Sequence, residues 1–237
     1  MPFRLFKKHG DNLNRPFDEV RFVSIDLETS GLDPKRNGIL AIGAVVVKER
    51  EIKLSEVFHV LVKPEGIFDE KSSFVHGITP ADVEDKPSFK EVAPSLLSFI
   101  DGGVLVGYNI GFDLSFLNEF LKRHGMPTLR GGALDLLPLT YGVMIKLGMD
   151  PVVLKMDYQA LMGKMGLDTL ADILSMPILR RHSSIGDAFT AAFILLKLLF
   201  LAKLAGCKSL GDLFELVREG ERHAKRIDVL SAIACGF

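Results

Sequence analysis

The amino-acid sequence predicts an α/β fold built around a sheet of mixed strand direction. Three apolar segments follow one another closely in the first quarter of the chain, and short gaps of this kind join antiparallel strands. The hydrophobic period then changes from that of strands to that of helices, and short strands alternate with helices. The length of 237 residues fits one ordinary domain with a small appendage, and the 48% of hydrophobic residues allows a sizeable core.

The first three strands are predicted from runs of β-branched and aromatic residues. Val20–Glu28 (VRFVSIDLE) forms the first strand and Ile39–Glu49 (ILAIGAVVVKE) the second. Glu56–Pro64 (EVFHVLVKP) forms the third, which ends at its proline. The short connections between them predict an antiparallel meander.

Alternating helices and strands follow this meander. Ser88–Asp101 has apolar residues at helical spacing, and Gly102–Asn109 (GGVLVGYN) reads as a short buried strand. Asp113–Gly125 is an amphipathic helix that ends at its glycine. A further short strand is expected at Ala133–Leu137, after which the chain reads mainly as helix.

One apolar segment, Ala188–Ala205 (AFTAAFILLKLLFLAKLA), is about as long as a short membrane span. Thr190, Lys197 and Lys203 interrupt its apolar run. We therefore interpret it as a helix buried within a soluble domain, and we expect no membrane partner. The N-terminal segment has no apolar stretch of the kind found in secretory signals.

The charge and the cysteine content indicate which kind of surface and which cellular compartment the sequence favours. The formal net charge of −1 excludes a cationic surface over the whole chain but leaves room for a local basic patch. The two cysteines, Cys207 and Cys235, can build neither a disulfide framework nor a Cys/His zinc site. These features favour a protein of the reducing cytoplasm.

The chain divides into three parts: an N-terminal arm over residues 1–19, a main domain over residues 20–205 and a helical extension over residues 206–237. Within the extension, four apolar residues share one helical face, and these are Leu210, Leu213, Phe214 and Val217. We favour packing of this face on the chain's own domain. Docking of a partner protein is the alternative.

Two acidic residues stand at the end of the first predicted strand, Asp26 and Glu28 in the segment DLETSG. Residues two apart in a strand point to the same face, so the two carboxylates converge. Like charges at the end of a buried strand are costly unless a cation balances them, and Mg²⁺ or Mn²⁺ prefers oxygen ligands. This pattern favours a metal site without establishing one, because many strands end in solvated acids.

Two later segments carry further groups of the same chemistry. Asn109 and Asp113 lie in NIGFD, where a strand gives way to a helix. His182, Gly186 and Asp187 lie in HSSIGD, just before the long apolar helix. Each acid alone is explained as a helix-capping residue, and the histidine alone as a solvated loop residue.

The combination of segments is more specific than any one of them. DLETSG, NIGFD and HSSIGD, in this order and at these separations, resemble the three motifs of the DnaQ-like 3′–5′ exonucleases, in the DEDDh branch of the DEDD superfamily. FVHGITPADV (Phe74–Val83) resembles a further segment of that family, which includes the proofreading epsilon subunits of bacterial DNA polymerase III. The resemblance covers Phe22 to Leu204. It implies a ribonuclease H-like fold, a mixed five-stranded sheet flanked by helices.

The resemblance also implies the roles of the catalytic residues. Asp26, Glu28, Asp113 and Asp187 would hold two divalent metal ions, Mg²⁺ or Mn²⁺. His182 would act as general base toward the attacking water, since its unperturbed pKa of about 6.5 suits proton transfer near neutrality. The product would be a nucleoside 5′-monophosphate released from a 3′ end.

Substrate contacts are implied by family position along the segment from Leu27 to Leu32 and at neighbouring sites. The implied residues are Leu27, Thr29, Gly31, Leu32, Val75, His76, Asn109 and Phe112. Arg180 and Arg181 either help to bring in phosphate or form a solvated pair. Tyr108 stands where many relatives carry histidine, and we expect no effect on catalysis because Asp113 is retained.

The expected function is a metal-dependent 3′–5′ exonuclease acting on single-stranded or frayed nucleic acid with a free 3′ end, DNA being favoured over RNA. A DNA polymerase subunit is a candidate partner, which would make the activity proofreading in DNA replication. The alternatives are an RNA-trimming exoribonuclease, a polymerase-associated binding subunit whose main role is docking, and a metal-dependent phosphatase.

Overall fold

The computed structural model describes residues 13–149 and 166–235, without the side chains of residue 70 and residues 223–235. In this part of the chain the strands form a five-stranded sheet in the order β3-β2-β1-β4-β5. Their bounds are β1 Phe22–Thr29, β2 Ile39–Lys48, β3 Glu51–Leu61, β4 Val104–Gly107 and β5 Leu134–Asp135. The first three strands pair antiparallel, and β4 and β5 continue the sheet parallel to β1. The predicted sheet of mixed direction is confirmed.

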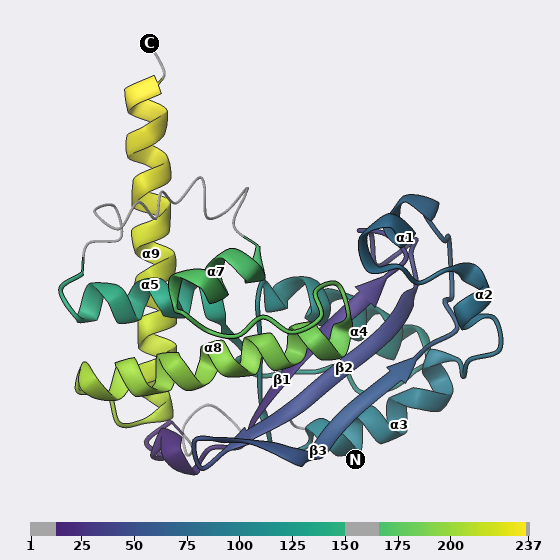
Figure 1. The fold of residues 1–237 in the computed structure, drawn as a ribbon, viewed down its shortest axis with the longest axis horizontal. Helices are drawn as coiled ribbons and strands as arrows, with labels where there is room; N and C mark the ends of the chain where they lie inside the picture. Colours follow the sequence, from purple (N-terminus) through teal and green to yellow (C-terminus); the bar gives the residue numbers. More distant parts are fainter. Residues whose placement is uncertain (1–12, 150–165, 236–237) are drawn as a thin grey trace.

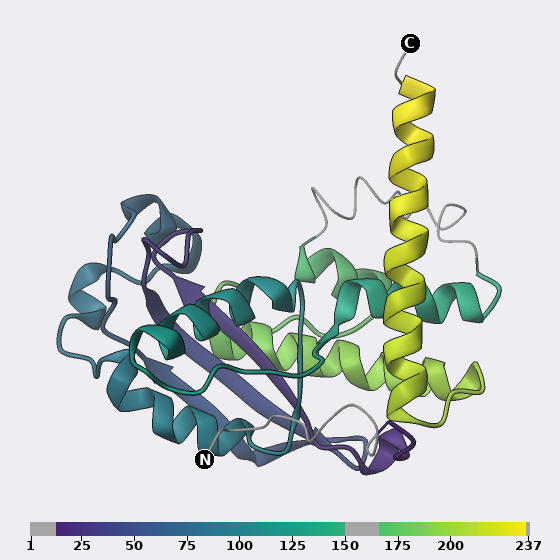
Figure 2. The same ribbon diagram turned by 180° about the vertical axis from the view of Figure 1, so that it is seen from behind.

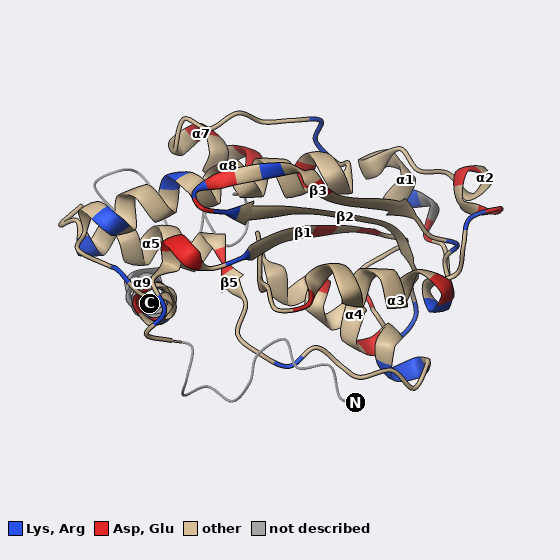
Figure 3. Cartoon of the chain, turned by 90° about the horizontal axis from the view of Figure 1, so that it is seen from below, with Lys and Arg blue, Asp and Glu red and all other residues tan. Residues whose placement is uncertain are grey.

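The helices lie on both faces of this sheet. Their bounds are α1 Glu70–His76, α2 Pro80–Val83, α3 Phe89–Ile100, α4 Ile110–Arg123, α5 Leu136–Lys146, α7 Leu167–Ile173, α8 Ser184–Leu204 and α9 Leu210–Cys235, with a 3₁₀ turn at Phe17–Glu19. Figure 3 shows α7 and α8 over one face of the sheet and α3 and α4 over the other. The short helices α1 and α2 lie beyond the ends of the central strands (Figure 1).

Alternation along β1 assigns its side chains to the two faces. Val23, Ile25 and Leu27 pack in the core formed with α3 and α4. Phe22 belongs to the core on the opposite face, and the Ser24 hydroxyl donates a hydrogen bond to the Ala188 carbonyl of α8 at 2.8 Å. The even-numbered residues of β1 therefore face α8.

The long apolar helix α8 satisfies the length and hydropathy expected of a membrane span, but 61% of its most apolar window is buried inside the protein. It crosses β1 and β2 (Figure 1). Thr190, which interrupts its apolar run, is buried, and its hydroxyl donates to the Gly186 carbonyl at 2.9 Å. The helix is a core element, as the sequence predicts.

The third strand begins earlier than its sequence indicates, at Glu51 in place of Glu56. Glu49 and Arg50 both adopt positive φ, 56° and 60°, and form the tight two-residue turn that matches the twist of a hairpin. The pairing jumps from Val45 opposite Val57 to Val46 opposite Lys53, so a bulge separates the two halves of β3. The first half of β3 contains charged residues, so the hydrophobic pattern of the sequence did not indicate a strand there.

The start of α9 packs on the rest of the chain. Leu213 and Leu216 are fully buried in the core shared with α5 and α8. The segment before α9 pairs with residues near the N-terminus, since the Phe17 amide donates to the Lys208 carbonyl at 3.1 Å and the Leu210 amide to the Arg15 carbonyl at 2.9 Å. The second half of α9 extends beyond the body of the molecule (Figures 1 and 2).

Candidate active site

Three carboxylates from two elements meet beside the sheet. Asp26 and Glu28 come from β1, and Asp187 comes from the first turn of α8. One oxygen of each lies within 4.8 Å of the others. Figure 3 shows the acidic stretch of β1 in red between the two helical layers. The i and i+2 spacing in the strand thus brings the acids together, as the sequence predicts.

A glycine in the neighbouring strand lets α8 come this close. Gly43 pairs with Asp26 in the sheet register, and a Cβ added at Gly43 would lie 2.3 Å from the backbone nitrogen of Ile185. Any side chain there would displace the start of α8. Gly43 therefore fixes the distance between Asp187 and the two acids of β1.

The loop before α8 folds back onto its first turn. A Cβ at Gly186 would lie 2.1 Å from the Arg180 carbonyl oxygen, so glycine is required for this close approach. His182 has a left-handed backbone with φ of 56°, and its amide donates to Asp187 Oδ2 at 3.1 Å. The Thr190 hydroxyl accepts from the Leu179 amide at 3.1 Å. These contacts hold the His182 backbone against Asp187.

The fourth acid, Asp113, reaches the site from the opposite helical layer. It lies in the first turn of α4, and its Oδ1 accepts a hydrogen bond from the Leu27 amide at 2.9 Å. Asn109 precedes the helix with φ of 51°, and its backbone N–H donates to Asp135 Oδ1 at 3.3 Å. Asp113 therefore lies at the backbone that joins Asp26 to Glu28.

Burial and like charge raise the pKa of three acids of the site. Burial, with the charge of Asp187 added, raises the pKa of Glu28 to about 7. Burial raises the pKa of Asp113 to about 8, against the opposing effect of the Leu27 amide. Burial and the charges of the other acids raise the pKa of Asp26 well above its usual range. The cluster is short of positive charge, and its hard oxygen donors fit divalent cations such as Mg²⁺ or Mn²⁺.

Among the residues that the structure describes, one lysine or arginine side chain reaches the cluster. Arg181 Nη1 lies 2.7 Å from Asp187 Oδ1, and its Nη2 lies 3.8 Å from Asp168 Oδ1. Arg180 is exposed. Of the two interpretations left open by the sequence, a solvated pair does not describe Arg181.

A cavity of about 250 Å³ lies in front of the acids. Its lining includes all five predicted catalytic residues and three of the predicted substrate-binding residues, which are Leu27, Asn109 and Phe112. Tyr108, Arg181, Gly166 and Leu167 are the other lining residues in the part of the chain that the structure describes. Gly166 and Leu167, at the start of α7, were not foreseen, because nothing in their local sequence marks them as site residues.

The other predicted substrate-binding residues lie outside the lining of this cavity. Leu32 and Val75 are exposed, at 84% and 55% of their surface. The Thr29 hydroxyl donates to the Gly31 carbonyl at 2.8 Å within the loop. His76 Nδ1 accepts from the Ile78 amide at 3.0 Å, and burial lowers the pKa of the His76 ring.

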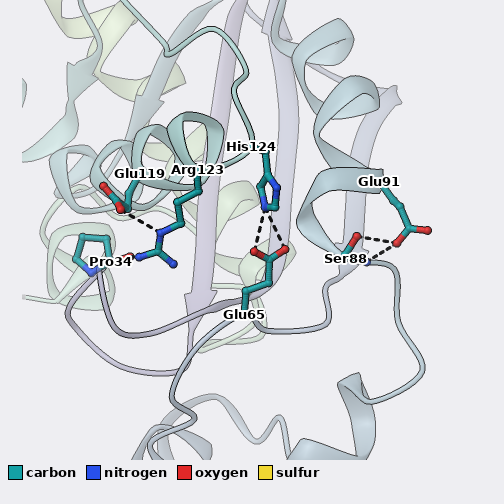
Figure 4. A network of polar contacts seen from close by, with 7 residues as sticks. All are labelled: Pro34, Glu65, Ser88, Glu91, Glu119, Arg123 and His124. Atoms are coloured by element: carbon teal, nitrogen blue, oxygen red, sulfur yellow. Dashed lines mark hydrogen bonds and ion pairs between the residues drawn. The ribbon is translucent and has the colours of Figure 1, made fainter.

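The end of α4 anchors the loop that carries Leu32 (Figure 4). Arg123 Nη2 donates to the Pro34 carbonyl at 2.7 Å, and its Nε bonds Glu119 at 3.0 Å. His124 Nε2 lies 2.9 Å from a carboxylate oxygen of Glu65, in the segment after β3. The same helix thus carries Asp113 at its start and holds two loops at its end.

Comparison with known proteins places this architecture in a family. A family model described as an exonuclease, RNase T, matches residues 23–195. The chain belongs to this exonuclease family. The DnaQ-like resemblance drawn from the three motifs is thereby confirmed.

Relatives of this exonuclease-family chain include polymerase proteins. It is 32% identical over 211 residues to a PolC-type DNA polymerase III of Caldanaerobacter subterraneus, across 89% of this chain and 14% of that protein. It is 28% identical over 197 residues to the DNA polymerase III subunit epsilon of Aquifex aeolicus, across 83% of this chain and 88% of that one. The chain thus spans about one seventh of the PolC-type relative.

The fold of this family member also matches solved exonucleases. A zinc-bound complex of E. coli exonuclease I with single-stranded DNA superposes with a TM-score of 0.63 at 16% identity, across 78% of this chain and 41% of that chain. At this identity the likeness concerns the fold, and it confirms the predicted ribonuclease H-like class.

Proposed function

We propose that this protein is a metal-dependent 3′–5′ exonuclease that removes nucleotides from the 3′ end of single-stranded or frayed DNA. The observation that carries the proposal is the convergence of Asp26, Glu28 and Asp187 within 4.8 Å, at the mouth of a cavity that His182 also lines. Family membership supports hydrolysis of phosphodiester bonds from a strand end. Released products would be nucleoside 5′-monophosphates.

The acids would hold two divalent cations, Mg²⁺ or Mn²⁺. Asp26, Glu28 and Asp187 offer converging oxygens, and Asp113 adds a fourth carboxylate whose position the Leu27 amide fixes. When bound there, two divalent ions stabilise the charge on the phosphate that reacts. The donor set consists of carboxylate oxygens, which suits hard cations.

His182 would take the proton of the attacking water. Its side chain is exposed at the cavity, while its backbone is held by Asp187. An exposed imidazole at the cavity is open to a water molecule that approaches the acids. The backbone of His182 is thus held in place while its ring faces the cavity.

The cavity supports an unpaired strand end as substrate. Its volume of about 250 Å³ lies below the range of roughly 300–1,000 Å³ usual for small-molecule pockets. We propose that one terminal nucleotide occupies this space. Leu32 and Val75, which lie outside the lining of the cavity, would meet bases of the strand through their exposed apolar side chains.

The names of the relatives support DNA as the nucleic acid and a DNA polymerase as partner. We place the activity in the cytoplasm, which the small number of cysteines favours. In this reading residues 20–205 form the catalytic unit, and the exonuclease would remove misincorporated nucleotides.

The assay that tests this proposal uses 5′-labelled single-stranded DNA and RNA of one sequence with Mg²⁺ or Mn²⁺. We expect a ladder that shortens from the 3′ end, faster on DNA. Asp26→Ala abolishes it, because the cluster loses a ligand, and His182→Ala slows it about 10²–10⁴-fold. Internal cuts, or full activity of Asp26→Ala, would contradict the assignment.

A further inference from the structure

We propose that Arg181 is an internal counter-cation of the carboxylate cluster, which competes with divalent cations for Asp187 and so sets the affinity of the site for metal. The inference rests on the metal-dependent function proposed above. It assigns a role to a residue that the three motifs do not include.

The contacts of Asp187 are the basis of this role. Its Oδ1 lies 2.7 Å from Arg181 Nη1, and its Oδ2 accepts the His182 amide. The Asp187 side chain is 7% exposed, whereas that of Arg181 is 26% exposed. The guanidinium thus reaches from the solvent side of the cavity to a buried carboxylate that also belongs to the metal-binding group.

Arg181 acts on the whole cluster as well as on Asp187. It lines the same cavity as Asp26, Glu28 and Asp187, and among the residues that the structure describes it is the one lysine or arginine in that lining. Its second contact, Asp168, is half-exposed and lies in α7. The guanidinium therefore lies between a surface carboxylate and the buried cluster.

A fixed positive charge at this position has two opposite effects. It gives Asp187 a positively charged partner at 2.7 Å whenever no divalent ion is bound, which holds the carboxylate in place. It also repels a divalent ion held by the same oxygens, and at a separation of a few ångströms this repulsion is not fully screened. Removal of the charge should therefore strengthen metal binding.

The test is a calorimetric titration of the full-length chain with MnCl₂, without nucleic acid. We expect Arg181→Gln to bind Mn²⁺ roughly tenfold more tightly than the unaltered protein, as expected for loss of a nearby unit charge at partial exposure. Arg181→Lys, which retains the charge, should bind within about twofold of the unaltered protein. Arg180→Gln is the matched control, because its side chain is exposed and next in sequence, and its affinity should also be unchanged.

Unchanged or weaker Mn²⁺ binding by Arg181→Gln, with binding intact in the unaltered protein, would overturn the role of Arg181 and leave the metal site standing. Absence of binding in the unaltered protein would overturn the proposed metal-dependent function itself. If Arg181→Gln fails to fold, Asp168→Asn provides the second variant. It removes the negative charge of Asp168 beside the guanidinium, while the contact of Arg181 with Asp187 is kept. It should bind Mn²⁺ about threefold more weakly, and unchanged binding would contradict the proposal.

Discussion

At the scale of single residues, ionisation of the clustered acids is unfavourable in the folded protein. Glu28 and Asp113 are buried and Asp26 is half-buried, all near Asp187, and the pKa of each of the first three is raised. An ionised group in such a position destabilises the fold until a cation is bound. Function and stability therefore conflict at these residues, as is usual for active sites.

This conflict predicts a pH dependence of stability in EDTA. An acid whose pKa is about 4 when unfolded and about 7 or 8 when folded binds more protons in the folded state between those values. Its favourable contribution is full below pH 4 and is lost as pH rises through 7 to 8. We expect the melting temperature in EDTA to fall between pH 5 and pH 8.5.

Mg²⁺ should reverse this fall, with the largest rise of melting temperature at the highest pH. Differential scanning fluorimetry over the pH series, with and without Mg²⁺, measures both effects. The control is the double variant Asp26→Asn with Glu28→Gln, in which the pH dependence should become shallower, with the part due to Asp113 retained. A melting temperature that rises steadily with pH in EDTA would contradict the account.

At the scale of elements, the site depends on how closely α8 approaches the sheet. Gly43→Ala would bring a Cβ to within 2.3 Å of the Ile185 backbone, so α8 must shift. We expect a loss of about 1–3 kcal/mol in the free energy of unfolding, measured by urea denaturation, together with weaker Mn²⁺ binding. Gly111→Ala in α4 is the control, because no atom lies within 4 Å of its added Cβ. Unchanged stability in Gly43→Ala would refute the close approach.

The end of α4 should influence substrate binding through the loop that it anchors. Arg123→Ala removes the bond to the Pro34 carbonyl, and the loop carries Leu32. We expect KM for a short single strand to rise about fivefold while kcat changes less than about twofold, since the acids are untouched. Arg130→Ala, an exposed position beyond the helix, should leave both constants unchanged. A fall in kcat with constant KM would place Arg123 in another role.

Helices, strands and site residues could be predicted from the sequence where a local sequence pattern determines them. The alternation of β1 placed Asp26 and Glu28 on one face, and the motif order singled out Asp113, His182 and Asp187, which line the same cavity. Contacts between segments that are distant in the chain have no local sequence pattern, so they could not be predicted. The need for Gly43, the pairing of Arg181 with Asp187 and the lining residues of α7 all depend on tertiary packing.

At the scale of the whole molecule, the C-terminal helix joins the core and then leaves it. Leu213 and Leu216 are buried against the main domain, whereas the later turns of α9 project from the body (Figure 2). A truncation at Ala205 would therefore remove core residues. Loss of partner binding in such a variant would not separate docking from folding, and point variants of exposed residues such as Arg218 and Arg222 are the better probes.

The central claim is that residues far apart in the chain form one site for divalent ions. Anomalous diffraction from crystals of the full chain soaked in MnCl₂ tests it most directly. The account predicts manganese density bridged by the oxygens of Asp26, Glu28 and Asp187, and loss of that density in crystals of Asp187→Asn. Manganese bound only elsewhere, with these carboxylates bare at saturating concentration, would contradict it.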